Sequence, residues 1–319
     1  MSLSKVNASL VNEISKKNLI INGNFQVSQR GTYTSATSLT TSSVYYLDRF
    51  KSKCDGVTGT ITHKVDQSVN GKITDTVLLS STSTATGRLE TLQIIEDIQQ
   101  FKGQATSFSA WVKSNNANAR IVIHTDGSNV QTSSTTHTGG GAWELLKGTV
   151  TNATNISNMN LYCGIQAAGT GNISGVASGD YFEMTFLQVE MGSVSTDFKH
   201  RSYGEELALC QRYYCETNNL PNGSLRASGY AGGGTTGGFT FDFPVTMRAV
   251  PTGSWTNGQT LYANNGAAAS VITTLGSTSA SVTSSDINLI WGSSYTSNSI
   301  AFYTGAFSAK TSFNFDAEL

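Results

Sequence analysis

The stretch Ser107-Phe-Ser-Ala-Trp-Val-Lys113 decides the fold class, because its side chains alternate along the chain. Phe108, Ala110 and Val112 are apolar, and two serines and Trp111 stand between and before them. Successive side chains of a β-strand point to opposite faces, so one apolar face and one mixed face predict a half-buried strand.

Segments of the same kind lie on both sides of this strand. They are residues 18–25, 45–50 and 88–96 on its N-terminal side, and residues 120–124, 143–150, 161–165 and 181–190 on its C-terminal side. Turns rich in Ser, Gly and Asn separate them. Short strands at this spacing predict an all-β fold, most simply a jelly-roll β-sandwich.

Composition supports strands and excludes several functions. Charged residues make up 13% of the 319 residues, about half of the usual ~25%, and Ser, Thr, Asn and 32 Gly replace them. With a net charge of −1, no global field draws the chain to nucleic acid, so we expect no nucleic-acid partner. The chain has no apolar run of about 18 residues that would span a membrane. Residues 1–17 lack the apolar core of a secretory signal.

The four cysteines are Cys54, Cys163, Cys210 and Cys215. Their spacing matches no metal-ligand pattern, and they are too few for a disulfide framework. We therefore predict reduced, mostly buried thiols in a protein made in a bacterial cytoplasm.

Residues 1–18 form an N-terminal arm in which apolar residues recur at roughly helical spacing. The arm is too short to fold alone. It is either a disordered tail or a peptide that attaches the chain to a virion. The residues that would make the attachment are Leu3, Val6, Leu10, Val11 and Ile14.

One helix is predicted, over residues 204–214, with Leu207, Cys210 and Tyr214 on one stripe. Glu205 and Glu206 stand in its first turn, where the helix dipole favours acidic side chains. The helix separates two β regions. We therefore expect an arm at 1–18, a jelly-roll domain at 19–200, a connecting helix at 201–218 and a C-terminal β tip domain at 219–319.

The last region alternates apolar and polar residues over 239–243, 287–291 and 313–319, which predicts a second, smaller β-sandwich. Tyr230, Trp255 and Tyr262 lie there in loop-like surroundings. An aromatic ring can stack on the C–H face of a sugar, so these three are the candidate ligand-binding residues. Trp111 and Trp143 are expected to pack in a core or an interface.

The sequence offers no catalytic motif at useful strength. Its histidines have no neighbouring metal-ligand partner, so we predict no metal and no cofactor. Carboxylate pairs such as Glu90 with Glu96, or Glu183 with Glu190, are expected by chance among 21 acidic residues. Glu96 and Glu190 are expected to bond to loops or to a neighbouring subunit. We predict that the chain is not an enzyme.

Several ordered segments resemble phage tail-fibre and related virion proteins. They are Asn18-Leu-Ile-Ile-Asn-Gly-Asn-Phe-Gln-Val-Ser-Gln-Arg-Gly31, Leu47-Asp-Arg-Phe50, Leu187-Gln-Val-Glu-Met-Gly192, Thr196-Asp-Phe-Lys-His-Arg201 and the helix 204–214. Residues 241–251 and 315–319 are similar to the tip segments of such fibres. The middle segment, 108–113 with 143–150, also looks like jelly-roll carbohydrate-binding modules.

The resemblance implies a homotrimer located in the virion as a tail fibre. Its partners would be other phage tail proteins and a host-surface glycan or outer-membrane receptor, bound by the distal domain. One alternative is a structural fibre or decoration protein of the head or neck, without a receptor. A depolymerising tailspike is a weaker alternative, because the sequence lacks a long repeated β-helix.

Overall fold

The computed structural model describes residues 18–126, 130–165, 175–216, 225–231, 234–256, 261–264, 269–295, 300–304 and 312–318. Contacts divide the chain into two compact units, Met1–Glu206 and Leu207–Leu319. Each unit is described by itself below.

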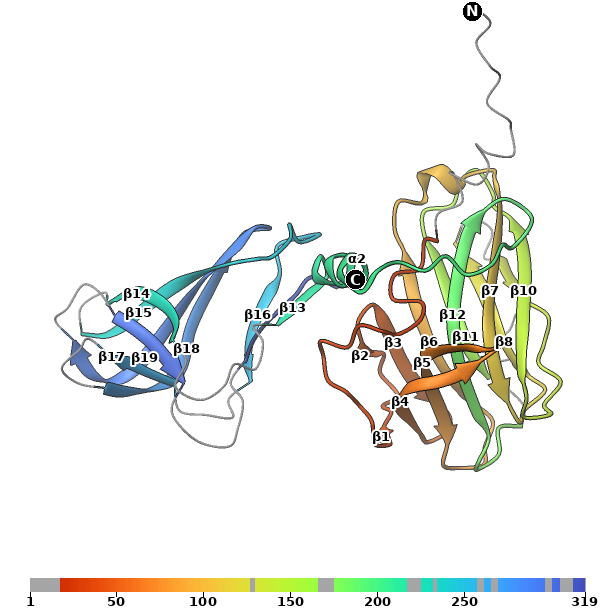
Figure 1. The fold of residues 1–319 in the computed structure, drawn as a ribbon, viewed down its shortest axis with the longest axis horizontal. Helices are drawn as coiled ribbons and strands as arrows, with labels where there is room; N and C mark the ends of the chain where they lie inside the picture. Colours follow the sequence, from red (N-terminus) through yellow and green to blue (C-terminus); the bar gives the residue numbers. More distant parts are fainter. Residues whose placement is uncertain are drawn as a thin grey trace, which may run out of the picture. The chain divides into compact units, whose positions relative to one another are not determined.

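The first unit is a sandwich of two sheets, visible in Figure 1. Within the described residues, sheet A has the order β1 (Thr37–Ser38), β4 (Gly59–Val69), β5 (Lys72–Ser81), β12 (Tyr181–Met191), β7 (Ala105–Ser114) and β10 (Trp143–Thr151). Sheet B has the order β2 (Val44–Leu47), β3 (Phe50–Asp55), β6 (Arg88–Ile95), β11 (Met159–Ile165), β8 (Ala119–Thr125) and β9 (Val130–Ser133).

The chain alternates between the two sheets, which gives the predicted jelly roll. From β5 onward, β6 lies in sheet B, β7 in sheet A and β8 in sheet B, and β10, β11 and β12 continue the alternation. The paired strands of both sheets are antiparallel. A single-turn 3₁₀ helix, η1 (Ile98–Phe101), leads from β6 towards β7.

The core lies between the sheets and follows from the alternation along each strand. In β7, Phe108, Ala110 and Val112 are fully buried and belong to the core, as predicted. Gly148 of β10 lies opposite Phe108, and a Cβ there would come within 2.2 Å of the phenyl ring. The Phe108 ring therefore occupies the space above a residue that has no side chain.

The predicted helix is present as α2 (Tyr203–Gln211), but it ends earlier than expected. Tyr214 lies in strand β13 (Tyr214–Glu216), where its backbone pairs with Asp316. The backbone N–H and C=O groups of residues 214–216 therefore bond to β21 (Ser312–Asp316) and are not available to continue the helix. Glu206, in the first turn of α2, is buried, as is Cys210 one turn later.

The second unit is β-rich, as predicted, but its strands are not arranged as a second sandwich. Within the described residues, β14 (Leu225–Ala231), β15 (Gly234–Asp242), β19 (Ser284–Tyr295), β18 (Ala269–Ala280), β17 (Leu261–Asn264) and β20 (Ile300–Thr304) form a closed barrel. β13, β21 (Ser312–Asp316) and β16 (Thr252–Thr256) form a separate three-stranded sheet. Phe239 and Phe243 pack near Phe313 and Phe315, so the last strand is buried as expected.

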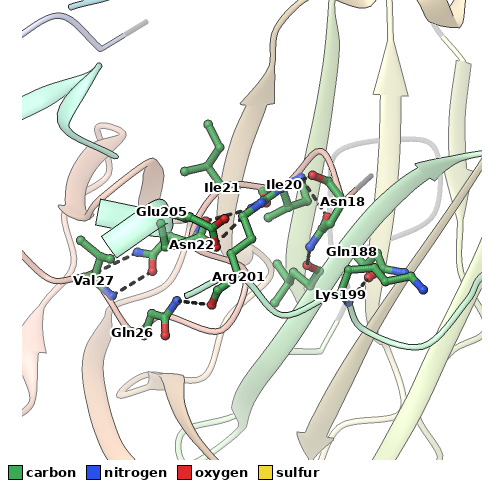
Figure 2. Close-up of polar contacts among 12 residues, drawn as sticks. Asn18, Ile20, Ile21, Asn22, Gln26, Val27, Gln188, Lys199, Arg201 and Glu205 are labelled. Atoms are coloured by element: carbon green, nitrogen blue, oxygen red, sulfur yellow. Dashed lines mark hydrogen bonds and ion pairs between the residues drawn. The ribbon is translucent and has the colours of Figure 1, made fainter. Parts of the chain in front are cut away.

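A buried polar cluster joins the first and last segments of the sandwich unit (Figure 2). We call Asn18, Asn22, Arg201 and Glu206 the terminal cluster. The Arg201 guanidinium donates to the carbonyls of Asn18 and Ile20 and pairs with Glu206 at 3.0 Å. Glu206 also accepts the backbone N–H of Asn22. Three of the segments that carry the tail-fibre resemblance therefore meet at one place.

Two more of these segments are held by their own buried side chains. Glu190 accepts hydrogen bonds from the backbone N–H and the hydroxyl of Thr196, and Gln188 accepts the backbone N–H of Lys199 at 2.8 Å. Asp48 accepts two hydrogen bonds from Gln29, at 2.6 and 2.8 Å. Burial raises the pKa of Asp48, against these bonds, which lower it. These residues order the loops at 28–31 and 193–200.

Candidate functional site

The three predicted ligand-binding residues lie in strands, not in loops. Tyr230 is in β14 opposite Gly238, Trp255 is in β16 opposite Phe313, and Tyr262 is in β17 opposite Val271. The loop expectation was wrong because Gly- and Ser-rich segments here pair as strands of the barrel and its neighbouring sheet. The structure describes the backbone of these three residues but not their side chains, so their role in ligand binding stays a prediction. Leu3, Val6, Leu10, Val11 and Ile14 also lie outside the described residues.

Trp111 and Trp143 are not core residues. Both are half-buried and lie on the outer face of sheet A, because Leu146, Ala110 and the other residues that alternate with them point into the core. Trp111 pairs across the strands with Leu145, which is 39% exposed. The prediction that these two tryptophans pack in a core is therefore wrong, and the prediction of an interface stays untested.

The carboxylate pairs considered for glycan hydrolysis do not have the required spacing. At about 3.3 Å per strand residue, Glu90 and Glu96 lie roughly 20 Å apart along the chain, whereas hydrolysis needs ~5–9.5 Å. Glu183 and Glu190 lie farther apart, along β12. Glu183 instead binds Lys64 at 3.0 Å and Thr76 at 2.7 Å. Glu190 bonds to a loop, as expected.

The outer face of sheet B gathers charged and aromatic side chains that the sequence did not single out as a site. We call it the B face and define it by the outward positions of four neighbouring strands. These are Lys51, Lys53 and Asp55 of β3, Arg88, Glu90, Leu92 and Ile94 of β6, Asn160, Tyr162 and Gly164 of β11, and Arg120, Val122 and His124 of β8. The residues between them face the core.

The strand pairing orders the B face in rows. One row runs Lys53, Glu90, Gly164 and Arg120 across β3, β6, β11 and β8. The next row runs Lys51, Leu92, Tyr162 and Val122. Rows of this kind place side chains of different strands about 5 Å apart, which is the spacing at which they can bind one ligand together.

Glu90 is the most unusual residue of the B face. It is 0% exposed, and neither of its carboxylate oxygens makes a hydrogen bond. Lys53 and Arg88 approach the same oxygen, Oε1, at 3.4 and 3.7 Å. Burial raises the pKa of Glu90, and the two cations offset this only in part.

Tyr162 lies next to Glu90 on the same face. Burial, and then the charge of Glu90, raise the pKa of the Tyr162 hydroxyl. The His124 ring meets the Tyr162 ring edge-on, with the centroids 6.1 Å apart. The B face thus combines an aromatic surface with charged groups, as a site that binds a polar ligand needs.

Arg120 lies at the other end of the Glu90 row and is 7% exposed. Its Nε–H donates to the carbonyl of Asn118 at 3.1 Å. Between Glu90 and Arg120 stands Gly164, where a Cβ would come within 2.2 Å of the Leu89 carbonyl oxygen. The close approach of the β6 backbone therefore excludes a side chain at position 164. No side chain stands between Glu90 and Arg120 in this row.

Glu90 supports a prediction on pH dependence. Its folded-state pKa lies above the ordinary 4.5, so its contribution to stability is full below pH 4.5 and is lost as the pH rises through the folded pKa. Glu90→Gln does not titrate. We expect its melting temperature to rise relative to wild type as the pH increases from about 4 to 8, measured by thermal unfolding.

Glu144→Gln is the matched control, because its carboxyl has the opposite shift. Hydrogen bonds from Thr138 lower the pKa of Glu144. This carboxyl therefore stabilises the fold above pH 4.5, and Glu144→Gln should lose stability relative to wild type as the pH rises towards that value. Two melting-temperature differences with the same slope would contradict the account of Glu90.

Other kinds of site find little support in the described part of the chain. Among these residues, no group of three or more His, Cys, Asp and Glu could hold a metal ion. Cys54, Cys163, Cys210 and Cys215 are buried, as predicted. No described helix has the length and apolar character needed to cross a membrane.

The chain is similar to solved carbohydrate-binding modules. The CBM22-1–GH10 modules of an endo-1,4-β-D-xylanase from Clostridium thermocellum, complexed with xylohexaose, match at 10% identity over 54% of this chain and 29% of that one, with a TM-score of 0.30. A family 61 module in complex with β-1,4-galactotriose matches at 11% identity over 55% of this chain and 99% of that one, with a TM-score of 0.32. A tandem CBM22 domain from Paenibacillus barcinonensis matches at 11% identity over 92% and 98%, with a TM-score of 0.31.

These similarities concern β-sandwich modules and do not assign a ligand to this chain. This chain spans only 29% of the first protein, which also includes a GH10 module. No protein-family model matches the sequence. No curated protein matches it either. The strand pairing itself defines the class: an all-β protein with a jelly-roll sandwich and a second β unit.

Proposed function

We propose that the chain is a phage tail-fibre protein that binds a host-surface glycan and does not cleave it. The observation that carries the glycan part is the B face, where Tyr162 and His124 stand beside the charged row of Lys53, Glu90 and Arg120. Sugars are bound by aromatic rings that pack on their C–H faces and by a few polar groups that bind their hydroxyls.

The virion part of the proposal is supported by the tail-fibre resemblance. The segments that carry it are far apart in sequence, yet Asn18, Arg201 and Glu206 bond to one another in the terminal cluster. A resemblance carried by one connected buried cluster is harder to explain by chance than the same motifs scattered over the molecule. The arm before Asn18 would attach to other tail proteins, and the second unit would form the tip.

Glycan binding is tested with Tyr162→Ala on an array of purified bacterial surface polysaccharides. Loss of the ring should weaken binding about tenfold, because it removes both stacking area and a hydroxyl. Tyr181→Ala is the control, since this half-buried tyrosine lies on β12 of sheet A. Equal loss in both variants would assign the effect to folding and remove the B face from the proposal.

The role in the virion is tested by competition. Purified protein should block adsorption of the phage that encodes it, whereas a head or neck decoration protein should not. Release of oligosaccharide from host envelope glycans would instead identify a depolymerase. Light scattering should give three times the 33.8 kDa of one chain, also after removal of residues 1–17. A monomer in both cases would contradict the trimer.

A further inference from the structure

Arg120 is a buried cation on the outer face of sheet B. Among the residues that the structure describes, no carboxylate forms an ion pair with it, and its Nε–H donates to the backbone carbonyl of Asn118. Arg88, on the same face, is paired with Asp55 at 2.8 Å. Burying an unpaired charge is costly, so such residues are usually paired or hold a ligand.

The neighbouring segments do not supply the missing acid. Residues 127–129 follow β8 and read Gly-Ser-Asn, and residues 166–174, which follow β11, contain no Asp or Glu. Burial alone lowers the pKa of Arg120 from its ordinary value, and no nearby acid acts against that shift. An arginine nevertheless stays protonated at neutral pH.

We propose that the B face binds an acidic saccharide, one that carries a carboxylate or a phosphate, and that Arg120 binds the acidic group. This inference rests on the proposed function of the same face. The guanidinium offers a planar pair of N–H donors that fits both kinds of oxyanion. Around it the described B face carries four basic side chains, Lys51, Lys53, Arg88 and Arg120, against two carboxylates, Asp55 and Glu90.

The neighbours of Arg120 on β11 are a glycine and a tyrosine. Gly164, directly opposite Arg120 on β11, presents no side chain. Tyr162 is the diagonal neighbour of Arg120 on the same face, at a Cα spacing of about 7–8 Å. One saccharide unit spans such a distance, so its acid can reach Arg120 while its ring packs against Tyr162.

The test measures binding of defined saccharides to the full chain by calorimetry. The probes are trigalacturonate, its fully methyl-esterified form, poly(glycerol phosphate) and a neutral galactose trisaccharide. Wild type should bind an acidic probe at least tenfold more tightly than the neutral ones, and added salt should weaken that binding. Comparison of trigalacturonate with poly(glycerol phosphate) tells whether the acid is a carboxylate or a phosphate.

Arg120→Met should remove the preference for acidic probes, and Arg120→Lys should restore part of it. The melting temperature of Arg120→Met should equal or exceed that of wild type, because no buried partner charge is left behind. Lys147→Met, an exposed lysine of β10, should change neither property. A purely structural role for Arg120 would instead lower the melting temperature and weaken all probes alike.

The outcomes separate this inference from the proposed function. Equal binding of acidic and neutral probes, unchanged by Arg120→Met but weakened by Tyr162→Ala, overturns the inference and leaves glycan binding in place. Failure of every probe and of the polysaccharide array overturns both. Acidic binding that Arg120→Met leaves intact overturns the assignment of Arg120.

Discussion

Arg201→Met should destabilise the sandwich unit by about 3–5 kcal/mol, because it leaves a buried carboxylate without its cation. Arg201 pairs with Glu206, which is 3% exposed, and donates to the carbonyls of Asn18 and Ile20. The substitution removes all of these bonds at once. Denaturant unfolding followed by tryptophan fluorescence, with Trp111 and Trp143 in this unit, measures the loss.

A double-mutant cycle with Glu206→Gln distinguishes the ion pair from the other bonds. If the pair dominates, Arg201→Met should cost much less in the Glu206→Gln background than in wild type. Lys147→Met controls for a cation changed to methionine at an exposed position and should stay within about 0.5 kcal/mol. A loss of similar size for Arg201→Met and Lys147→Met would refute the structural role of the terminal cluster.

Phe108→Ala should have the second large effect, a loss of about 3–5 kcal/mol. The side chain is fully buried between the sheets, and its ring covers Gly148 on the neighbouring strand. Glycine cannot fill the space that the ring vacates, so we expect a cavity that the sheets do not close. Chemical denaturation gives the free energy of unfolding directly.

Phe198→Ala is the matched control for this cavity. Phe198 is half-buried, lies outside the core, and packs against Phe186 and His200 with ring centroids 5.0 and 4.8 Å away. The same atoms are removed, but solvent can enter the space, so the loss should be about 1–2 kcal/mol. Equal losses at 108 and 198 would contradict the placement of Phe108 in the core.

The alternation of apolar residues predicted the sandwich because burial of one strand face is a local property of sequence. Phe108, Ala110 and Val112 show this, since each points into the core as expected. The same rule failed for Glu90. A charged residue on the outward side of a strand is expected to be exposed, yet neighbouring strands bring enough atoms around it to bury it completely.

The remaining misses come from contacts between distant parts of the chain. Nothing local marks Glu206 as buried, because its partners Asn22 and Arg201 are brought to it by the fold. Helical spacing extended the helix to Tyr214, but pairing with Asp316, about a hundred residues later, makes that residue a strand. The sequence did not mark Arg120 as unusual, because only the fold shows which residues surround it and that no described carboxylate pairs with it.

The terminal cluster joins the first described segment of the sandwich unit to its last segment. Asn18, the first residue that the structure describes, and Arg201, near the end of the unit, bond directly, so these two segments lie side by side. Domains with adjacent ends tolerate insertion into other chains and circular permutation. We therefore expect residues 18–206 to fold when they are inserted as one piece into another chain.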